Sequence, residues 1–162
     1  MHIQHWNTGM DGKETTEIAK EIAADCIAIR VRFVNRVITG LYERALKPFD
    51  IKTSQMAMLV LLSVRGESSP TDVGRILQLE KSTVSRNIGR MRKKGWLEVT
   101  NLQGYPRQRV ALSQVIRVTP KGARLLATLH GEWAKAQDAA RKLLGEEGLS
   151  SVRELYDTLR GR

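Results

Sequence analysis

Residues 79–99 read LEKSTVSRNIGRMRKKGWLEV. Val84, Ile88 and Met91 recur at i, i+4 and i+7, so this spacing predicts a helix over about 81–94 with one inward apolar face. The opposite face carries small, polar and cationic residues: Ser82, Ser85, Arg86, Gly89 and Lys93. We therefore expect an amphipathic helix whose outer surface has no bulky side chain.

Two further helices are predicted upstream of this one. The first runs from an N-cap at Thr53 or Ser54 to about Val64 and is closed by a glycine. The second begins at Ser69-Pro70-Thr71-Asp72, which supplies a serine N-cap, a proline at the first helical position and a carboxylate at the third. A turn then separates this short helix from the helix over 81–94.

A β-hairpin is predicted downstream of the same helix. Gly95 is a natural C-terminal cap, and the segments 96–100 and 110–118 are typical of short strands. The loop over 101–108 between them holds a glycine and a proline. Helix, short helix, turn, longer helix and hairpin follow one another as in a winged helix-turn-helix, so we expect a mainly α protein with a small β-hairpin.

Longer helices flank this central segment. Apolar spacing predicts one helix over 16–47, ended by Pro48, and another from Thr119-Pro120 to about Leu144, with a last amphipathic helix beyond Gly145 and Gly148. The chain is thus expected to have a disordered arm over 1–15 and a single domain over 16–162. Within that domain we expect a winged lobe over 48–118 between dimerisation helices over 16–47 and 119–162.

The flanking helices carry apolar residues on more than one face. These include Phe33, Leu41, Trp133, Leu155 and Tyr156. A chain of 162 residues cannot bury all of them in one compact core, so a two-fold homodimer is expected to cover the excess. Such a dimer would set two recognition helices about 34 Å apart, one turn of a DNA duplex.

Positive charge is concentrated in the middle of the chain. The formal net charge is +10, and residues 81–117 hold nine basic residues against a single acid, Glu98. This clustering favours a polyanionic partner, and double-stranded DNA fits it best. The predicted helix would lie in the major groove, with its N-terminal residues at the base edges and its cations at the phosphates.

Individual side chains are assigned to this contact by their chemistry. The hydroxyls of Ser82, Thr83 and Ser85 donate and accept, and the planar fork of Arg86 matches guanine. Arginines at the tip of the hairpin suit an adjacent minor groove. The candidate DNA-binding residues are Lys81, Ser82, Thr83, Ser85, Arg86, Arg90, Arg107 and Arg109.

Each assignment has a plainer alternative. Ser82 and Thr83 also suit capping of their own helix, Arg86 an exposed surface position, and Arg107 and Arg109 a solvated turn. For the whole protein, the same basic segment fits a nonspecific architectural nucleic-acid binder, or an adaptor for an acidic protein.

The run LEKSTVSRNIGRMRKKGWLEV, followed by a basic wing and VTPKG, resembles the MarR family of transcriptional regulators. The resemblance implies a recognition helix that includes Lys81, Ser82, Thr83, Ser85 and Arg86, and a dimer built from the N- and C-terminal helices. It also implies a repressor that a small aromatic or phenolic effector releases from a palindromic operator. The wing departs from the family pattern, in which an aspartate and arginines stand where this chain has Val110, Ala111 and Leu112.

Other chemistry is not indicated by the sequence. There is no phosphate-binding loop, Cys-x-x-Cys pair or clustered histidine set, so we expect no enzyme, no cofactor and no metal site. The absence of a long apolar run favours a cytoplasmic protein without a membrane partner. Cys26 lies in an apolar stripe and is expected to be a buried thiol, while a redox-responsive regulator using Cys26 stays open as the alternative.

Overall fold

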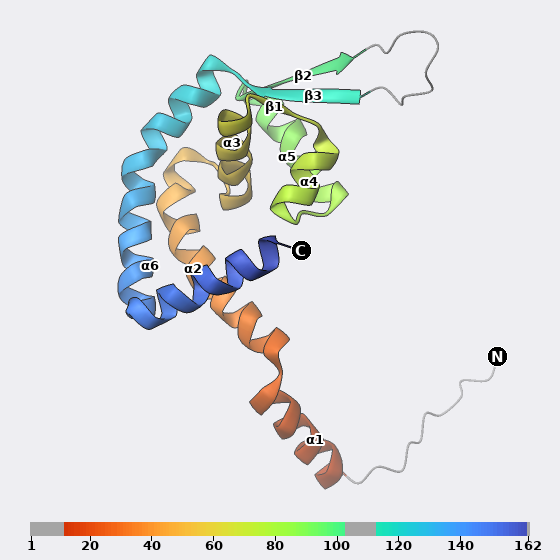
Figure 1. The fold of residues 1–162 in the computed structure, drawn as a ribbon, viewed down its shortest axis with the longest axis vertical. Coiled ribbons are helices and arrows are strands. Elements are labelled where there is room, and N and C mark those ends of the chain that lie inside the picture. Colours follow the sequence, from red (N-terminus) through yellow and green to blue (C-terminus); the bar gives the residue numbers. More distant parts are fainter. Residues whose placement is uncertain (1–11, 103–112, 162) are drawn as a thin grey trace, which may run out of the picture. The chain divides into compact units, whose positions relative to one another are not determined.

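The computed structural model describes residues 12–102 and 113–161, drawn in colour in Figure 1. The chain forms two compact units, one ending at Ile38 and the other beginning at Thr39. The elements in chain order are α1 (Gly12–Asp25), α2 (Ile27–Leu46), the 3-10 turn η1 (Lys47–Phe49), α3 (Thr53–Arg65), β1 (Glu67–Ser68), α4 (Pro70–Leu77), α5 (Lys81–Lys93), β2 (Leu97–Leu102), β3 (Ser113–Val118) and α6 (Pro120–Arg160).

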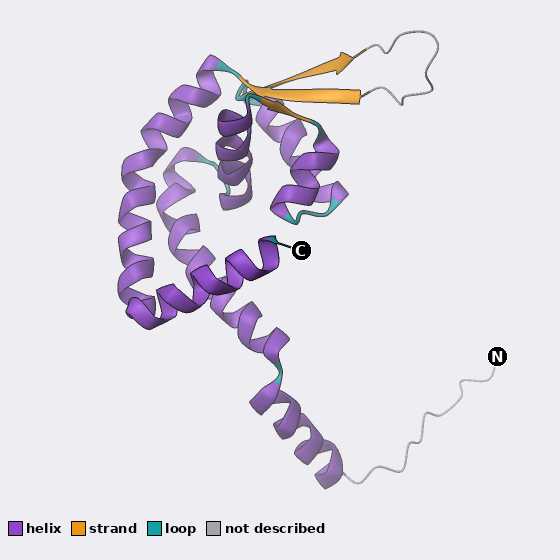
Figure 2. Ribbon diagram, in the orientation of Figure 1, coloured by secondary structure: helices purple, strands orange, loops and turns teal. Residues whose placement is uncertain are grey.

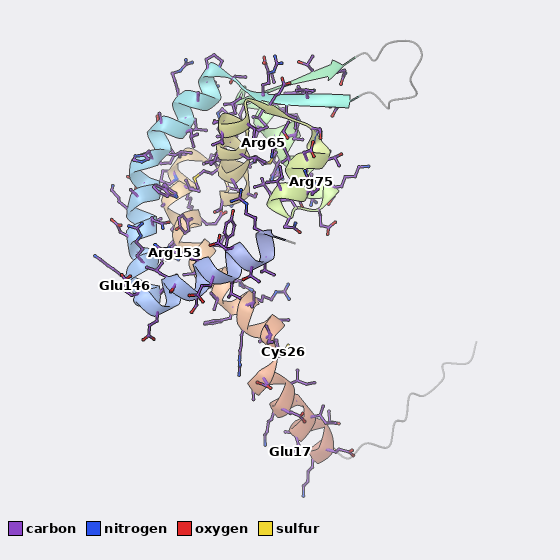
Figure 3. All side chains as sticks on the ribbon, in the orientation of Figure 1. Glu17, Cys26, Arg65, Arg75, Glu146 and Arg153 are labelled. Carbon is purple, nitrogen blue, oxygen red and sulfur yellow. The ribbon has the colours of Figure 1, made fainter. Side chains whose placement is uncertain are left out.

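The first unit corrects two expectations about the N-terminal region. Helix α1 begins at Gly12, so the expected arm over 1–15 ends too late, and its residues 1–11 lie outside the described part of the chain. The helix predicted over 16–47 is interrupted at Cys26 (Figure 3). There the guanidinium of Arg30 donates to the carbonyl of Ala24, which in an unbroken helix would accept the N–H four residues on.

The second unit is built around one hydrophobic core. Helices α3, α4 and α5 enclose it together with the sheet and the first part of α6 (Figures 1 and 2). Leu59, Met91 and Leu129 come from α3, α5 and α6 and have almost no exposed surface. The end of α2 is tied to α6, because the Tyr42 hydroxyl donates to Oε1 of Gln137 at 2.5 Å.

Two predicted helix starts are confirmed in atomic detail. The Ser69 hydroxyl accepts the N–H of Asp72 at 3.1 Å and donates to its carboxylate at 2.8 Å, which fixes the start of α4. The Thr119 hydroxyl accepts the N–H of Gly122 at 3.1 Å at the start of α6. In both cases a proline occupies the first helical position.

The expected cap of α3 is wrong by one residue. The N-cap is Lys52, and Thr53 is already helical. Side chains elsewhere serve the first N–H groups, since Gln55 accepts from the Lys52 N–H at 3.0 Å and Glu43 accepts from the Thr53 N–H at 2.8 Å. A hydroxyl at the cap is therefore unnecessary.

The three strands form one antiparallel sheet in the order β1-β3-β2 (Figure 2). The hairpin of β2 and β3 is in register from Leu97 opposite Val118 to Leu102 opposite Ser113, which confirms the predicted pair. The segment 103–112 between them lies outside the described residues. Strand β1 does not follow from the sequence pattern, because two residues are too short to show a period and the strand is defined by pairing with β3.

Helix α6 keeps one of its two predicted breaks. Gly145 has φ 65° and ψ 177°, a conformation outside the helical region, whereas Gly148 remains helical. The segment after Gly145 is largely exposed and carries the apolar side chains of Val152, Leu155, Tyr156 and Leu159.

Candidate nucleic-acid interface

Helix α5 is held by its inward face, as the spacing predicts. Val84, Ile88 and Met91 are all buried in the core of the second unit. The apolar spacing does not reveal a fourth inward residue: Asn87 is also buried, and its amide donates to the Ser54 hydroxyl at 3.2 Å. Three apolar contacts and one polar contact therefore fix which face of α5 points outward.

The turn between α4 and α5 sets where α5 begins. Gln78 takes a left-handed conformation (φ 51°, ψ 46°), and the Leu79 N–H returns to the carbonyl of Gly74 at 2.9 Å. The N-cap of α5 is Glu80, whose carbonyl accepts the N–H groups of the third and fourth residues that follow. The tight turn joins the two helices as a helix-turn-helix unit.

The outward face of α5 is open along its length. Ser82, Ser85 and Arg86 are exposed, and among the described residues no atom of another part of the chain lies within 4 Å of the position that a Cβ would take at Gly89. Ser82 and Thr83 follow the first helical residue and do not cap the helix, so the capping alternative is wrong. Their hydroxyls lie 3.5 Å and 3.4 Å from a guanidinium nitrogen of Arg86, which brings these three polar groups together.

The cations of the central cluster fall into two groups. Within the described residues, Lys94 pairs with Asp50, and Arg117 pairs with Glu67 across the sheet. Five other cations along α5 form no ion pair with a carboxylate of the described residues: Lys81, Arg86, Arg90, Arg92 and Lys93. The charge available for a polyanion is therefore concentrated on α5.

Two predicted contacts cannot be placed. Arg107 and Arg109 belong to the segment 103–112, outside the described residues. At the base of the wing, Arg117 stands between two acids in register, Glu67 on β1 and Glu98 on β2. The single acid of the basic segment thus lies opposite a cation on the neighbouring strand.

Cys26 is not the buried thiol that the sequence predicts. It is partly exposed, at the break between α1 and α2 (Figure 3). No group of three or more His, Cys, Asp or Glu side chains able to hold a metal occurs among residues 12–102 and 113–161. A redox role for Cys26 stays a prediction without further support.

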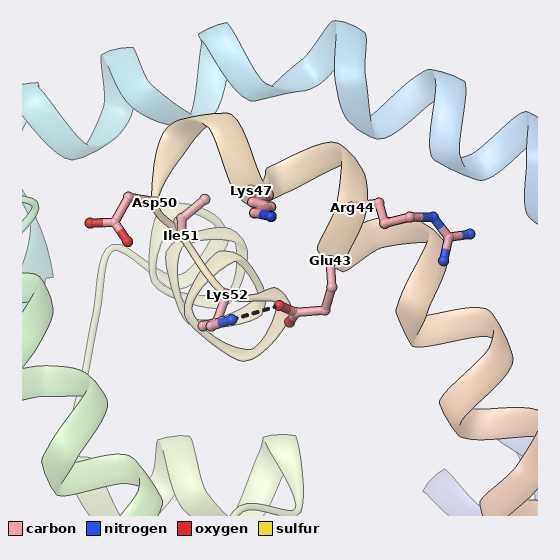
Figure 4. A pocket seen from close by; sticks show the side chains of 6 residues that line it. All are labelled: Glu43, Arg44, Lys47, Asp50, Ile51 and Lys52. Atoms are coloured by element: carbon pink, nitrogen blue, oxygen red, sulfur yellow. Dashed lines mark ion pairs between the residues drawn. The ribbon is translucent and has the colours of Figure 1, made fainter.

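A shallow hollow of about 280 Å³ lies where the end of α2 turns into α3 (Figure 4). Its lining is mostly charged: Glu43, Arg44, Lys47, Asp50, Ile51 and Lys52. Partial burial alone would raise the pKa of Glu43, but the hydrogen bond from the Thr53 N–H and the Lys52 ammonium at 3.3 Å outweigh it and lower that pKa. Glu43 and Lys52 therefore neutralise one another at the rim.

Comparison with known proteins identifies relatives of this chain. Residues 49–104, which run from the η1 turn through α5 to the end of β2, match the model of the MarR family. Over 118 residues the chain is 24% identical to the multiple antibiotic resistance protein MarR of Salmonella typhimurium, covering 73% of this chain and 77% of that one. The winged central segment of this chain is therefore similar to the MarR family.

Solved structures of MarR proteins share this fold over most of the chain. A mutant of MarR from E. coli complexed with operator DNA superposes with a TM-score of 0.71 at 18% identity, over 85% of this chain and 96% of that one. BpsR of Bordetella bronchiseptica, whose DNA binding is regulated by 6-hydroxynicotinic acid, gives a TM-score of 0.70 at 16% identity, over 83% and 98%.

The described residues share the winged helix-turn-helix fold of these solved structures. In that fold α4 and α5 are the helix-turn-helix and β2 and β3 the wing. Over the two described ranges, no helix is long and apolar enough to cross a bilayer.

Proposed function

We propose that this chain is a sequence-specific, dimeric DNA-binding repressor that reads a palindromic operator with α5. One observation carries the proposal: the face of α5 that the core leaves outward is small, polar and cationic, and five exposed cations along this helix have no carboxylate partner in the described structure. Such a face meets both needs of operator binding, close approach to base edges and neutralisation of phosphates.

Arg86 is assigned to base reading. It is exposed near the N-terminal end of α5, and the hydroxyls of Ser82 and Thr83 lie beside its guanidinium. Those neighbours narrow the directions in which the side chain projects, which favours a bidentate contact with guanine. Lys81, Ser85 and Arg90 flank it and are assigned to phosphates or base edges.

Exposed apolar surface on the flanking helices supports a homodimer. In the first unit, Phe33 is 68% exposed, and in α6 Leu155 and Leu159 are 60% and 63% exposed. Large apolar side chains exposed in this number on a single chain are typical of a surface that another subunit covers. We assign residues 16–47 and 119–162 to that interface and residues 48–118 to the winged lobe.

An aromatic or phenolic effector completes the proposal. Support comes from BpsR, which shares this fold and whose DNA binding is regulated by 6-hydroxynicotinic acid. Binding that favours one spacing of the two recognition helices would lower operator affinity by linkage.

The test is selection from a random duplex library by the purified full-length chain, followed by titration of the selected and a scrambled duplex at physiological salt. A regulator of this kind should prefer the selected duplex by at least about a thousandfold. The selection is then repeated with each of a panel of aromatic acids, and an effector is identified because less of the selected duplex is recovered with the protein. Sedimentation at micromolar concentration shows whether the protein is a dimer. Equal affinity for both duplexes would leave only a nonspecific architectural binder.

A further inference from the structure

One cation of the basic segment is committed to a contact inside the protein. The Lys94 ammonium, at the C-terminal cap of α5, donates to the backbone carbonyl and to the Oδ2 carboxylate oxygen of Asp50, both at 2.5 Å. It also lies 4.4 Å from the centroid of the Trp96 ring. Lys94 therefore joins two segments that are 44 residues apart in the chain.

The Asp50 end of this contact is a defined turn. Asp50 takes a left-handed conformation (φ 49°, ψ 43°), and its N–H closes the η1 turn on the Lys47 carbonyl at 3.1 Å. Aspartate is among the residues that tolerate this conformation best. The turn leads from α2 into α3 and presents a carbonyl and a carboxylate to the same ammonium.

The Trp96 end is equally fixed. The Trp96 N–H donates to the carbonyl of Met91, and the Gly95 N–H to the carbonyl of Arg92, both at 2.9 Å, with Gly95 at φ 73°. These two bonds are the Schellman closure of a helix, which needs a left-handed residue at the glycine position. The Trp96 carbonyl in turn accepts the N–H of Thr119 at 3.1 Å, so this residue links α5 to the start of α6.

Lys93, the preceding residue, offers a direct contrast. It is exposed and has no ion pair within the described residues, whereas two-thirds of the Lys94 side chain is covered. We propose that Lys94 is a positioning residue for DNA recognition: it holds the C-terminal end of α5 against the turn before α3 and does not bind phosphate. The inference rests on the proposed DNA-binding function, since it names how the reading helix is held.

The DNA test compares three variants of the full chain: Lys94→Met, Lys94→Arg and Lys93→Met. Methionine keeps the apolar stem of the side chain and removes the charge. Lys94→Met should therefore lower the affinity for the selected duplex by about fivefold, the upper end of what one exposed ion pair contributes. Binding to the scrambled duplex and the salt slope should stay unchanged. Lys94→Arg should restore affinity, because its guanidinium retains the donor and the ring contact.

Lys93→Met is the matched control for a phosphate contact. It should lower the affinity for both duplexes by the same factor. It should also reduce the slope of log affinity against log salt by about 0.9 for each phosphate that is no longer bound. If Lys94→Met behaves in that same way, Lys94 binds phosphate and the positioning role is overturned. If Lys94→Met lowers the melting temperature and leaves the affinity of the folded protein for the selected duplex unchanged, the role is purely structural and the proposal also fails.

A measurement without DNA separates this inference from the proposed function. The hydrogen bond and charge of Lys94, with a smaller contribution from Lys52, hold the pKa of Asp50 below its ordinary value. NMR titration should show that pKa rise in Lys94→Met and not in Lys93→Met. If the pKa of Asp50 is the same in Lys94→Met as in the wild type, Lys94 does not contact Asp50 in solution and the proposal fails. If the wild-type chain binds all duplexes equally, the proposal of sequence-specific DNA binding is overturned. The NMR titration still decides whether Lys94 contacts Asp50.

Discussion

The backbone at Gly122 lies against the carbonyl of Trp96. A Cβ built on Gly122 would stand 2.3 Å from that oxygen and 2.9 Å from Cγ1 of Val118. The first turn of α6 can therefore approach the start of β2 only because residue 122 has no side chain. This close approach is also where the Thr119 N–H reaches the Trp96 carbonyl at 3.1 Å.

Gly122→Ala should destabilise the fold by about 1–3 kcal/mol, because the blocking atom is backbone and cannot rotate away. For a chain of this size the melting temperature should fall by roughly 2–4 °C for each kcal/mol. Gly131→Ala is the matched control on the same helix, since no described atom outside the adjoining helix backbone lies within 4 Å of its Cβ position. It should be stabilising by about 0.5–1 kcal/mol from helix propensity, and a urea titration of both variants measures the contrast. Equal stability of the two variants would contradict the close approach.

The cap of α4 makes folding sensitive to acid. A hydrogen bond from the Ser69 hydroxyl, then one from Arg75, lowers the pKa of Asp72 below its ordinary value. A carboxyl with a depressed pKa stabilises the fold above its unfolded value, and that contribution disappears as the pH falls through the folded value. In urea titrations, Asp72→Asn should therefore flatten the loss of stability below about pH 5.

Asp157→Asn, at an exposed position on α6, is the control that removes one carboxylate away from the cap of α4. NMR titration of Asp72 in the wild type gives the direct reading. An Asp72 titration at the ordinary value, with no change of profile in the variant, would contradict the prediction.

The parts of the fold that follow from local rules could be predicted from the sequence. Ser69 and Thr119 cap their helices because a hydroxyl followed by proline satisfies the first free N–H groups without help from the rest of the chain. The inward positions of Val84, Ile88 and Met91 follow from helical period alone.

Features that depend on contacts between distant residues could not be predicted. Strand β1 exists only because residue 67 pairs with Arg117, fifty residues away. The same limit applies to the basic cluster. Charge counted along the sequence cannot reveal that Arg117 and Lys94 are held by carboxylates elsewhere in the fold, so the count overstates the cations free to meet DNA.

Arg86→Ala should reduce discrimination between operator and scrambled DNA. Loss of a bidentate guanine contact costs about 1–3 kcal/mol at the base pair that is read, and the selected consensus should relax at that position. Arg86→Lys should be nearly as damaging, since an ammonium cannot form the planar two-bond contact. Arg124→Ala on α6 removes one exposed arginine outside α5 and should leave the ratio of the two affinities unchanged. A uniform loss on every duplex would move Arg86 from base reading to the phosphates.

Arg90 lies on α5 with no carboxylate partner in the described part of the chain, which suits a phosphate contact. Each such contact releases condensed counterions, so Arg90→Gln should lower the slope of log affinity against log salt by about 0.9 per subunit, on operator and scrambled duplex alike. Lys135→Gln removes the same charge, but that ammonium already pairs with Glu132 at 2.6 Å on α6, and its slope should match the wild type. Because both variants lower the net charge equally, a slope that falls in both would indicate a general charge effect and would exclude a specific phosphate contact at Arg90.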